Sequence, residues 1–301
     1  IYGGNENLEA VEFLKHLNTV FKGRKNGAVL IAEESTAWPM ITGDPKDGGL
    51  GFDYKWNMGW MNDFTNYMRC DPYFRKNNYG ELTFSMLYAY SENFVLVFSH
   101  DEVVHGKGSM MGKMPGETLE AKAENLRAAY GFMMSHPGKK LLFMGQEFAQ
   151  LQEWSEARSL DWYLLDEPEH KDMQEYVKKL LHLYKEYPAL YTETKGYGAF
   201  EWINANDCER SIFSFIRKTT EADYKNSIGF VCNFTPMERP DYVVGVPKAG
   251  TYKRLVTTET GEKQVVSYRA KKGECDGRPY RLEIPLRPYE SVVFEFPKTR
   301  K

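Results

Sequence analysis

The stretch that decides the fold spans residues 94–105 and reads FVLVFSHDEVVH. Its first five residues are apolar and mostly β-favouring, a run too short for an independent helix and too apolar for an exposed strand. Such a run is typical of a buried strand in a parallel sheet. The sequence then turns abruptly polar, at His100, Asp101 and Glu102. In α/β barrels and doubly wound sheets, the carboxyl ends of strands are where catalytic groups lie.

A second apolar run ends in the same way. Residues 29–32 read VLIA and lead directly into Glu33 and Glu34. Either group of acids, taken alone, is compatible with the start of a solvated loop. Two strands that both end in acids favour a site, in which one strand tip offers a carboxylic acid and the other an aspartate preceded by a histidine.

Composition indicates a soluble globular protein of 301 residues, enough for one large domain and a smaller one. The formal net charge of −3 gives no electrostatic argument for binding nucleic acid or an acidic membrane. No signal peptide and no apolar run long enough to span a membrane are found, so we expect a cytoplasmic protein. The four cysteines show no CxxC spacing, which argues against a zinc site or a disulfide framework.

Helical and strand patterns alternate in the first two thirds of the chain. The helix over 7–24, for example, has apolar residues at spacings of three and four. The expected elements are helices over 7–24, 61–68, 118–135 and 173–187, strands over 29–32, 52–56, 94–98 and 140–144, and loops over 36–51 and 105–116. Four strands with helices between them are half of an eight-fold (β/α)8 barrel. The chain opens at Ile1 with a helix and no preceding strand, so we expect it to start within a domain.

After Gly198 the pattern changes to short strand-like runs separated by turn-rich segments. The expected strands are 200–203, 211–217, 227–234, 251–256, 280–284 and 292–296. This is the pattern of an antiparallel β-sandwich. The predicted fold is therefore α/β, with the C-terminal half of a TIM-type barrel over 1–197 and a β-sandwich domain over 198–301.

Paired carboxylates at the tips of parallel strands are typical of enzymes that cleave glycosidic bonds. A separation of about 5–5.5 Å serves a retaining route and about 6.5–9.5 Å an inverting one. Carboxylates at strand ends also serve metal and phosphoryl chemistry, but neither is favoured here. His100 and His105 do not form the H-E-x-x-H pattern of a zinc helix, and no Gly-rich loop that would cradle phosphate is present. We expect no metal and no cofactor.

Several segments together resemble the 1,4-α-glucan (glycogen) branching enzymes of the α-amylase superfamily. The resemblance is strong over the first two thirds of the chain and looser over the final sandwich. The segments that carry it are 31–36 (IAEEST), 51–61 (GFDYKWNMGWM), 98–107 (FSHDEVVHGK), 114–116 (MPG), 136–145 (HPGKKLLFMG) and 159–162 (SLDW).

The resemblance implies a retaining transfer in which an α-1,4 glucan is cleaved and the segment passes to a 6-hydroxyl. Glu33, which follows Ala32, would be the general acid/base, and burial would raise its pKa. Asp101 would stabilise the transition state, with His100 hydrogen-bonding beside it. Glu34 is interpreted as a neighbour that points the other way. Four aromatic residues are either core residues or stacking surfaces for glucan: Trp38, Tyr54, Trp56 and Trp60.

One part of the family pattern is missing. The nucleophile of the family is an aspartate in a Gly-Phe-Arg-x-Asp context, and the segment Asp276-Gly277-Arg278 is only a superficial echo of it. We therefore expect an α-glucan substrate and a partner that supplies the N-terminal half of the barrel. Two alternatives stay open: an α-amylase-type hydrolase, and an inactive fragment that binds glucan or complements another chain.

Overall fold

The computed structural model describes residues 4–192, 196–220, 224–259 and 265–298. Its helices cluster in the first two thirds, and most lie close to their expected positions. They are α1 (Leu8–Gly23), α2 (Met58–Arg69), α3 (Tyr79–Thr83), α4 (Met110–Lys113), α5 (Leu119–Ser135), α6 (Pro168–Glu186) and α7 (Pro188–Tyr191). None of these described helices is long and apolar enough to cross a membrane.

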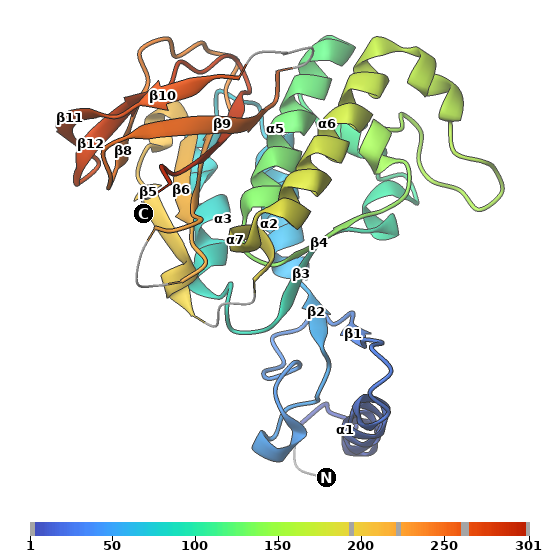
Figure 1. Ribbon diagram of the computed structural model, residues 1–301. Helices are drawn as coiled ribbons and strands as arrows, with labels where there is room; N and C mark the ends of the chain where they lie inside the picture. Colours follow the sequence, from blue (N-terminus) through green and yellow to red (C-terminus); the bar gives the residue numbers. More distant parts are fainter. Residues whose placement is uncertain (1–3, 193–195, 221–223, 260–264, 299–301) are drawn as a thin grey trace.

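A four-stranded parallel sheet organises this part of the chain. Its strands lie in the order in which they occur in the sequence: β1 (Ile31–Ala32), β2 (Tyr54–Trp56), β3 (Phe94–Phe98) and β4 (Lys139–Leu142). Sequential parallel strands joined by crossovers are the repeating unit of a (β/α)8 barrel, as expected. Figure 1 shows α1 and β1 at the end of the sheet farthest from the strands coloured orange and red.

The rest of the chain forms two antiparallel sheets. The six-stranded sheet has the order β10-β9-β13-β7-β6-β5, and the three-stranded sheet the order β11-β12-β8. The bounds are β5 (Phe200–Asn204), β6 (Ile212–Arg217), β7 (Ile228–Asn233), β8 (Val243–Val246), β9 (Thr251–Thr257), β10 (Ser267–Arg269), β11 (Lys271–Cys275), β12 (Arg278–Glu283) and β13 (Ser291–Glu295). The all-β arrangement is that of the predicted sandwich.

Three of these strands were not expected from the sequence: β8, β10 and β11. Strands β10 and β11 are largely exposed and rich in charge, so they lack an apolar alternation. Strand β8 contains Gly245, where a Cβ atom would lie 2.1 Å from the carbonyl oxygen of Cys275. The glycine is needed for this close approach of two backbones, which local sequence patterns do not reveal.

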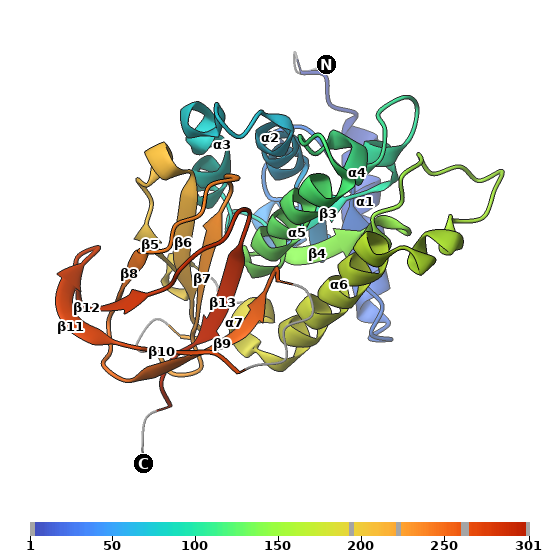
Figure 2. The ribbon, with the colours of Figure 1, turned by 90° about the horizontal axis from the view of Figure 1, so that it is seen from above.

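Helix α5 joins the parallel sheet to the six-stranded sheet. Thr118 caps its first turn by accepting a hydrogen bond from the Ala121 amide at 3.1 Å. Its last eleven residues, 125–135, are all buried. Figure 2 shows why: β6, β7 and β13 lie against one side of α5, while β3 and β4 lie on another. One hydrophobic cluster therefore runs through both parts of the chain.

Phe132 is the central aromatic residue of this junction. Its ring meets those of Phe213, Phe215 and Phe230 edge-on, with centroids 5.7–5.9 Å apart. Edge-to-face contacts of this kind are favourable because the positive ring edge meets the negative face. A ring on α5 is thus packed by rings on β6 and β7.

Arg75 links the same elements through hydrogen bonds. Its side chain is fully buried. Nη1 donates to Asn125 Oδ1 at 3.0 Å and to the Phe234 carbonyl at 2.8 Å, while Nη2 donates to the Met68 carbonyl at 2.7 Å. A buried guanidinium is tolerated because these acceptors replace its hydration. The three acceptors come from α2, from α5 and from the segment after β7.

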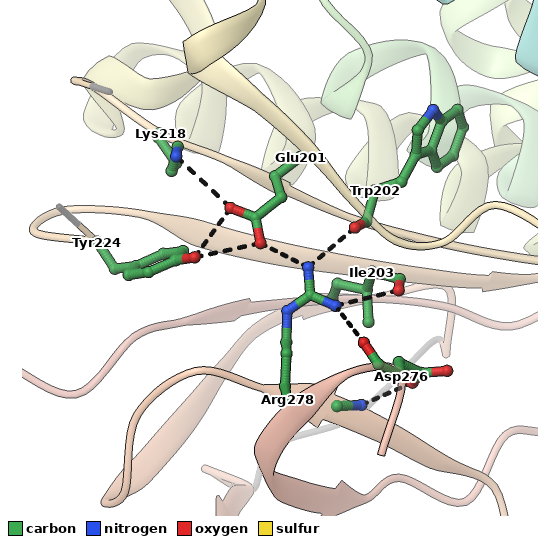
Figure 3. A network of polar contacts seen from close by, with 8 residues as sticks. Glu201, Trp202, Ile203, Lys218, Tyr224, Asp276 and Arg278 are labelled. Carbon is green, nitrogen blue, oxygen red and sulfur yellow. Dashed lines mark hydrogen bonds and ion pairs between the residues drawn. The ribbon is translucent and has the colours of Figure 1, made fainter. Parts of the chain in front are cut away.

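The two antiparallel sheets are connected by a polar network around Glu201 (Figure 3). Tyr224 donates its hydroxyl to the Glu201 carboxylate at 2.9 Å, and Lys218 Nζ lies 3.5 Å from it. Arg278 Nη2 donates to the same carboxylate at 2.5 Å and to the Trp202 carbonyl at 2.9 Å. Because Glu201 lies on β5 and Arg278 on β12, the network binds one sheet to the other.

The segment Asp276-Gly277-Arg278 is part of this connection. Asp276 accepts hydrogen bonds from Asn204 Nδ2 at 3.0 Å and from the Gly245 amide at 2.8 Å. Asp276 and Arg278 therefore both connect strands of the two sheets. Its likeness to the family nucleophile is superficial, as the sequence indicated.

Replacing Arg75 by methionine tests the junction. The Arg75→Met variant retains an apolar stem but leaves the Asn125 side chain and two carbonyls without their donor. We expect the free energy of unfolding, measured by urea titration, to fall by about 3 kcal/mol or more. The neighbouring Lys76→Met removes an exposed pair with Glu209 and should leave the urea midpoint close to that of the wild type. Equal urea midpoints for the two variants would contradict this role of Arg75.

The Glu201 network predicts a pH dependence of stability. Burial raises the pKa of Glu201, but the bonds from Arg278 and Tyr224 outweigh it and hold the pKa below the usual 4.5. A carboxylate with a lowered pKa in the folded state stabilises that state above pH 4.5, and this contribution is lost as the pH falls. The wild type should therefore be more stable than Glu201→Gln at pH 7, with the difference shrinking below pH 4.5. A difference independent of pH from 7 to 3 would refute the assignment.

Candidate functional site

The tip of β3 is fixed by a local capping structure. Directly after the strand, Ser99 caps a single 3-10 turn over His100–Val103 and accepts a hydrogen bond from the Asp101 amide at 3.1 Å. The Glu102 carboxylate accepts the amide of Ser99 in return, which completes a capping box. Glu102 is buried by this role. The turn thus separates the two acids of the motif: Glu102 holds the backbone, and Asp101 remains available.

Asp101 and His100 lie together on this turn, half-exposed. His100 Nε2 is 3.4 Å from Asp101 Oδ1, and their side chains are 45% and 40% exposed. The imidazole also lies over Phe143, just after β4, with ring centroids 5.9 Å apart. A carboxylate supported by an adjacent imidazole can accept hydrogen bonds from hydroxyl groups of a ligand.

The two glutamates after β1 have different surroundings. Glu34 accepts a bond from Lys55 Nζ at 2.8 Å and another from the Thr36 amide at 2.7 Å. Burial raises the pKa of Glu34, but these two partners outweigh it and lower the pKa overall. Glu33 is exposed. Glu34 is therefore the glutamate held in place by a neighbouring strand, and Glu33 is the one that faces solvent.

The exposure of Glu33 corrects one expectation. An acid whose pKa is raised by burial requires surrounding protein, and β1 is the edge strand of the four-stranded sheet. Only β2 pairs with it among the described strands. The environment that the resemblance implies for this acid is absent from the residues that the structure describes.

Strands β1 and β3, which carry Glu33 and Asp101 at their ends, are not adjacent in the sheet. Strand β2 lies between β1 and β3, so the strands that carry the two acids are about 10 Å apart. Ala32 is in register with Lys55, and Lys55 with Phe94. The tip of β3 consequently extends beyond that of β1. Both acids follow the carboxyl ends of their strands and so lie at the same edge of the sheet. Asp101 lies farther along the strand direction than Glu33.

The four aromatic candidates are placed in different environments. Trp38 and Trp56 are partly buried near the carboxyl edge, where each packs against a hydrophobic cluster. Trp60 is only 1% exposed and stacks on Phe64 with ring centroids 4.8 Å apart. Trp60 is therefore a core residue without a face for a sugar. Tyr54 begins β2, where it is in register with Ile31, and its ring lies near Lys139 Nζ at the start of β4.

The loop after Asp101 is held by two charged residues that the sequence analysis did not single out. Lys113 donates to the carbonyls of Lys107 at 2.7 Å and Gly108 at 2.9 Å, and also to that of Glu102. Burial lowers the pKa of Lys113 to about 8. Glu153 accepts the amide of Gly108 at 2.6 Å. These contacts join segments up to 45 residues apart in sequence, so no local pattern reveals them.

Gln146 completes the edge of the sheet. It follows β4, is buried, and donates its amide to the Ser99 carbonyl at 3.4 Å. The three strand tips β1, β3 and β4 thus present Glu33, Asp101 with His100, and Gln146. No cluster of three metal-ligating side chains is found among the described residues. The arrangement offers a solvent-facing carboxylic acid, a second carboxylate and hydrogen-bonding groups.

Comparison with known proteins finds relatives over the whole chain. The chain is 50% identical over 306 aligned residues to a protein of Butyrivibrio fibrisolvens named "1,4-alpha-glucan branching enzyme GlgB", covering 100% of this chain and 47% of that protein. A protein of the same name from Aquifex aeolicus (strain VF5) is 48% identical over 300 residues, covering 98% and 47%. The chain spans about half the length of the curated relatives it matches.

Solved structures show the same fold at low sequence identity. An α-amylase from H. orenii aligns with a TM-score of 0.63 at 13% identity, covering 99% of this chain and 59% of that chain. A type I pullulanase from Bacillus subtilis aligns with a TM-score of 0.66 at 15% identity, covering 93% and 41%. Residues 202–297 match the family "Alpha amylase, C-terminal all-beta domain". The chain is therefore similar over its whole length to about half of proteins named 1,4-α-glucan branching enzymes, with an α/β part that precedes an all-β domain of the α-amylase C-terminal type.

Proposed function

We propose that this chain provides part of a 1,4-α-glucan branching enzyme. In the proposed reaction an α-1,4 glucan is cleaved and the released segment is transferred to a 6-hydroxyl, with retention of configuration. The observation that carries the proposal is the identity of 45–50% with proteins named branching enzymes over 97–100% of the chain. The acids at the carboxyl edge of the sheet are consistent with it.

Each residue of the edge has a proposed role. Glu33 protonates the glycosidic oxygen as the bond to the anomeric carbon breaks, and later accepts the proton of the incoming 6-hydroxyl. Asp101 stabilises the positive charge that develops on the sugar ring and binds sugar hydroxyls together with His100. Trp38 and Trp56 contribute stacking surfaces. The nucleophilic aspartate lies outside the 301 residues, because no Gly-Phe-Arg-x-Asp segment occurs in them.

The proposal includes a partner, the N-terminal half of the same barrel, and a cytoplasmic location. The support for the partner is an exposed apolar surface on α1 and β1, where Phe13 is 63% exposed and Ile31 is 45% exposed. Large apolar side chains left exposed on a helix and on an edge strand are typical of a face that another segment covers. The same covering segment would bury Glu33, because Glu33 follows the edge strand β1. We further propose that the barrel part ends near residue 197.

The chain alone is expected to be inactive as a branching enzyme. Without a nucleophile, the purified 301 residues should form no α-1,6 linkages from amylose, as measured by debranching followed by chain-length analysis. Addition of the remaining N-terminal part of the Butyrivibrio relative should restore branching, since that protein is 50% identical to this chain. New α-1,6 linkages made by the chain alone would overturn the proposal that the nucleophile lies elsewhere.

Substitutions of the two glutamates distinguish their roles within the restored enzyme. Glu33→Gln should lower transfer from amylose by about 10²–10⁴-fold, the usual contribution of a general acid. Cleavage of α-maltosyl fluoride should be much less affected, because fluoride leaves without protonation. Glu34→Gln is the matched control and should retain most activity on both substrates. If Glu33→Gln loses both activities equally, or Glu34→Gln shows the selective loss, the assignment of Glu33 is wrong.

A further inference from the structure

The turn that carries Asp101 is too short to satisfy its own backbone. It spans only His100–Val103, and a single turn leaves its last carbonyl groups without partners inside it. Such carbonyls need donors from elsewhere, because an unpaired backbone group away from water is costly. The carbonyl of Val103 accepts the amide of Trp154 at 2.9 Å. The carbonyl of Glu102, the residue directly after Asp101, is satisfied in a different way.

Its donor is the side chain of Lys113, the last residue of α4. Lys113 Nζ donates to the Glu102 carbonyl at 2.5 Å, and to the carbonyls of Lys107 at 2.7 Å and Gly108 at 2.9 Å. An ammonium group has three donors and no acceptor, so the three carbonyls match it one to one. In the part of the chain that the structure describes, no carboxylate pairs with this ammonium. Lys113 therefore serves the backbone alone.

The charged groups around Lys113 do not replace these contacts. Glu102 and Glu153, the acids nearby, each accept a backbone amide instead. Burial lowers the pKa of Lys113 to about 8, and the like charges of Arg69 and Lys107 act in the same direction. At pH 7 the side chain consequently still has its proton and all three donors.

The loop between the acceptors of Lys113 has a demanding backbone. His105, Gly106 and Gly108 all have positive φ angles, of 57°, 81° and 73°. The left-handed region is uncommon for a histidine, and a residue is kept there only by the contacts that surround it. Lys113 supplies such contacts, because it connects the start of the loop, at Glu102, to its later part, at Gly108.

We propose that Lys113 is a positioning residue for Asp101, because its bond to the Glu102 carbonyl fixes the turn on which the Asp101 carboxylate lies. The inference rests on the role proposed above for Asp101 in stabilising the transition state. A group with that role is most effective when it is already in place before charge develops. The capping box holds the turn at Ser99, and Lys113 holds it at the other end.

The imidazole of His100 reports the position of Asp101 independently of activity, because its Nε2 lies 3.4 Å from Asp101 Oδ1. In the 301-residue chain carrying isotope-labelled histidine, Lys113→Met should change the side-chain nitrogen shifts of His100 at pH 7, measured by NMR. The buried His136 is an internal reference and should keep its shifts. Lys107→Met is the matched control, because it removes an exposed ammonium of the same loop that donates to no described residue. Unchanged His100 shifts in Lys113→Met overturn the proposal.

The consequence for catalysis is measured in the restored enzyme, formed by this chain and the N-terminal part of the Butyrivibrio relative. Lys113→Met should lower kcat for branching of amylose by about tenfold to 10²-fold, the effect of a misplaced catalytic group. KM should change much less, because the lost interaction is made mainly in the transition state. A loss confined to KM, or a kcat equal to that of Lys107→Met, contradicts the positioning role.

The two measurements separate this inference from the proposed activity. If the restored wild-type enzyme makes no α-1,6 linkages, the proposed function fails, and the His100 shifts still decide whether Lys113 fixes the turn. Near-ultraviolet circular dichroism checks that each variant is folded. If Lys113→Met does not fold, Lys113→Gln decides, since its side chain is shorter and has only two donors. His100 shifts identical to those of the wild type in that variant refute the role of Lys113.

Discussion

Helix α5 is buried on two opposite sides, and the rest of this structure depends on that packing. The helix packs against the parallel sheet and also against β6, β7 and β13 (Figure 2), so it cannot shift without opening both cores. Gly131 shows how close the packing is: a Cβ atom there would lie 2.3 Å from Ser291 Oγ and 2.6 Å from the Tyr176 hydroxyl. Interiors of this density transmit a displacement at one face to the other. The position of the parallel sheet is therefore set partly by the all-β part of the chain.

At the carboxyl edge of the sheet, individual charged side chains hold the loop backbone through hydrogen bonds. Glu102 binds the amide of Ser99, Lys113 binds three carbonyls of the following loop, and Glu153 binds the amide of Gly108. These charged residues hold loop backbone groups that no sheet or helix partner satisfies. Among the described residues, the side chains of Asp101 and His100 do not hold loop backbone groups in this way. Structural and chemical roles are thus divided between neighbouring residues of one short motif.

Cationic side chains lie at the amino edge of the parallel sheet, near the end of α5. The carboxyl edge presents Glu33 and Asp101, whereas the amino edge carries Lys139, Lys140 and Arg217 close to the end of α5. The negative end of the α5 dipole offers partial compensation to those cations, because the Ser135 carbonyl accepts a bond from Arg217.

The sequence by itself determined the strands β3 and β4, the helix α5 with its Thr118 cap, and the change to antiparallel strands after residue 198, because each depends on local periodicity or capping. It also placed Glu33 and Asp101 at strand ends. Tertiary structure alone decided that β2 separates these acids, that Trp60 fills the core, and that Glu34 rather than Glu33 pairs with Lys55. Strand order, relative height and burial depend on contacts between distant segments, such as the 50 residues between Arg75 and Asn125. No local pattern encodes such contacts, which is why the elements could be predicted and their mutual positions could not.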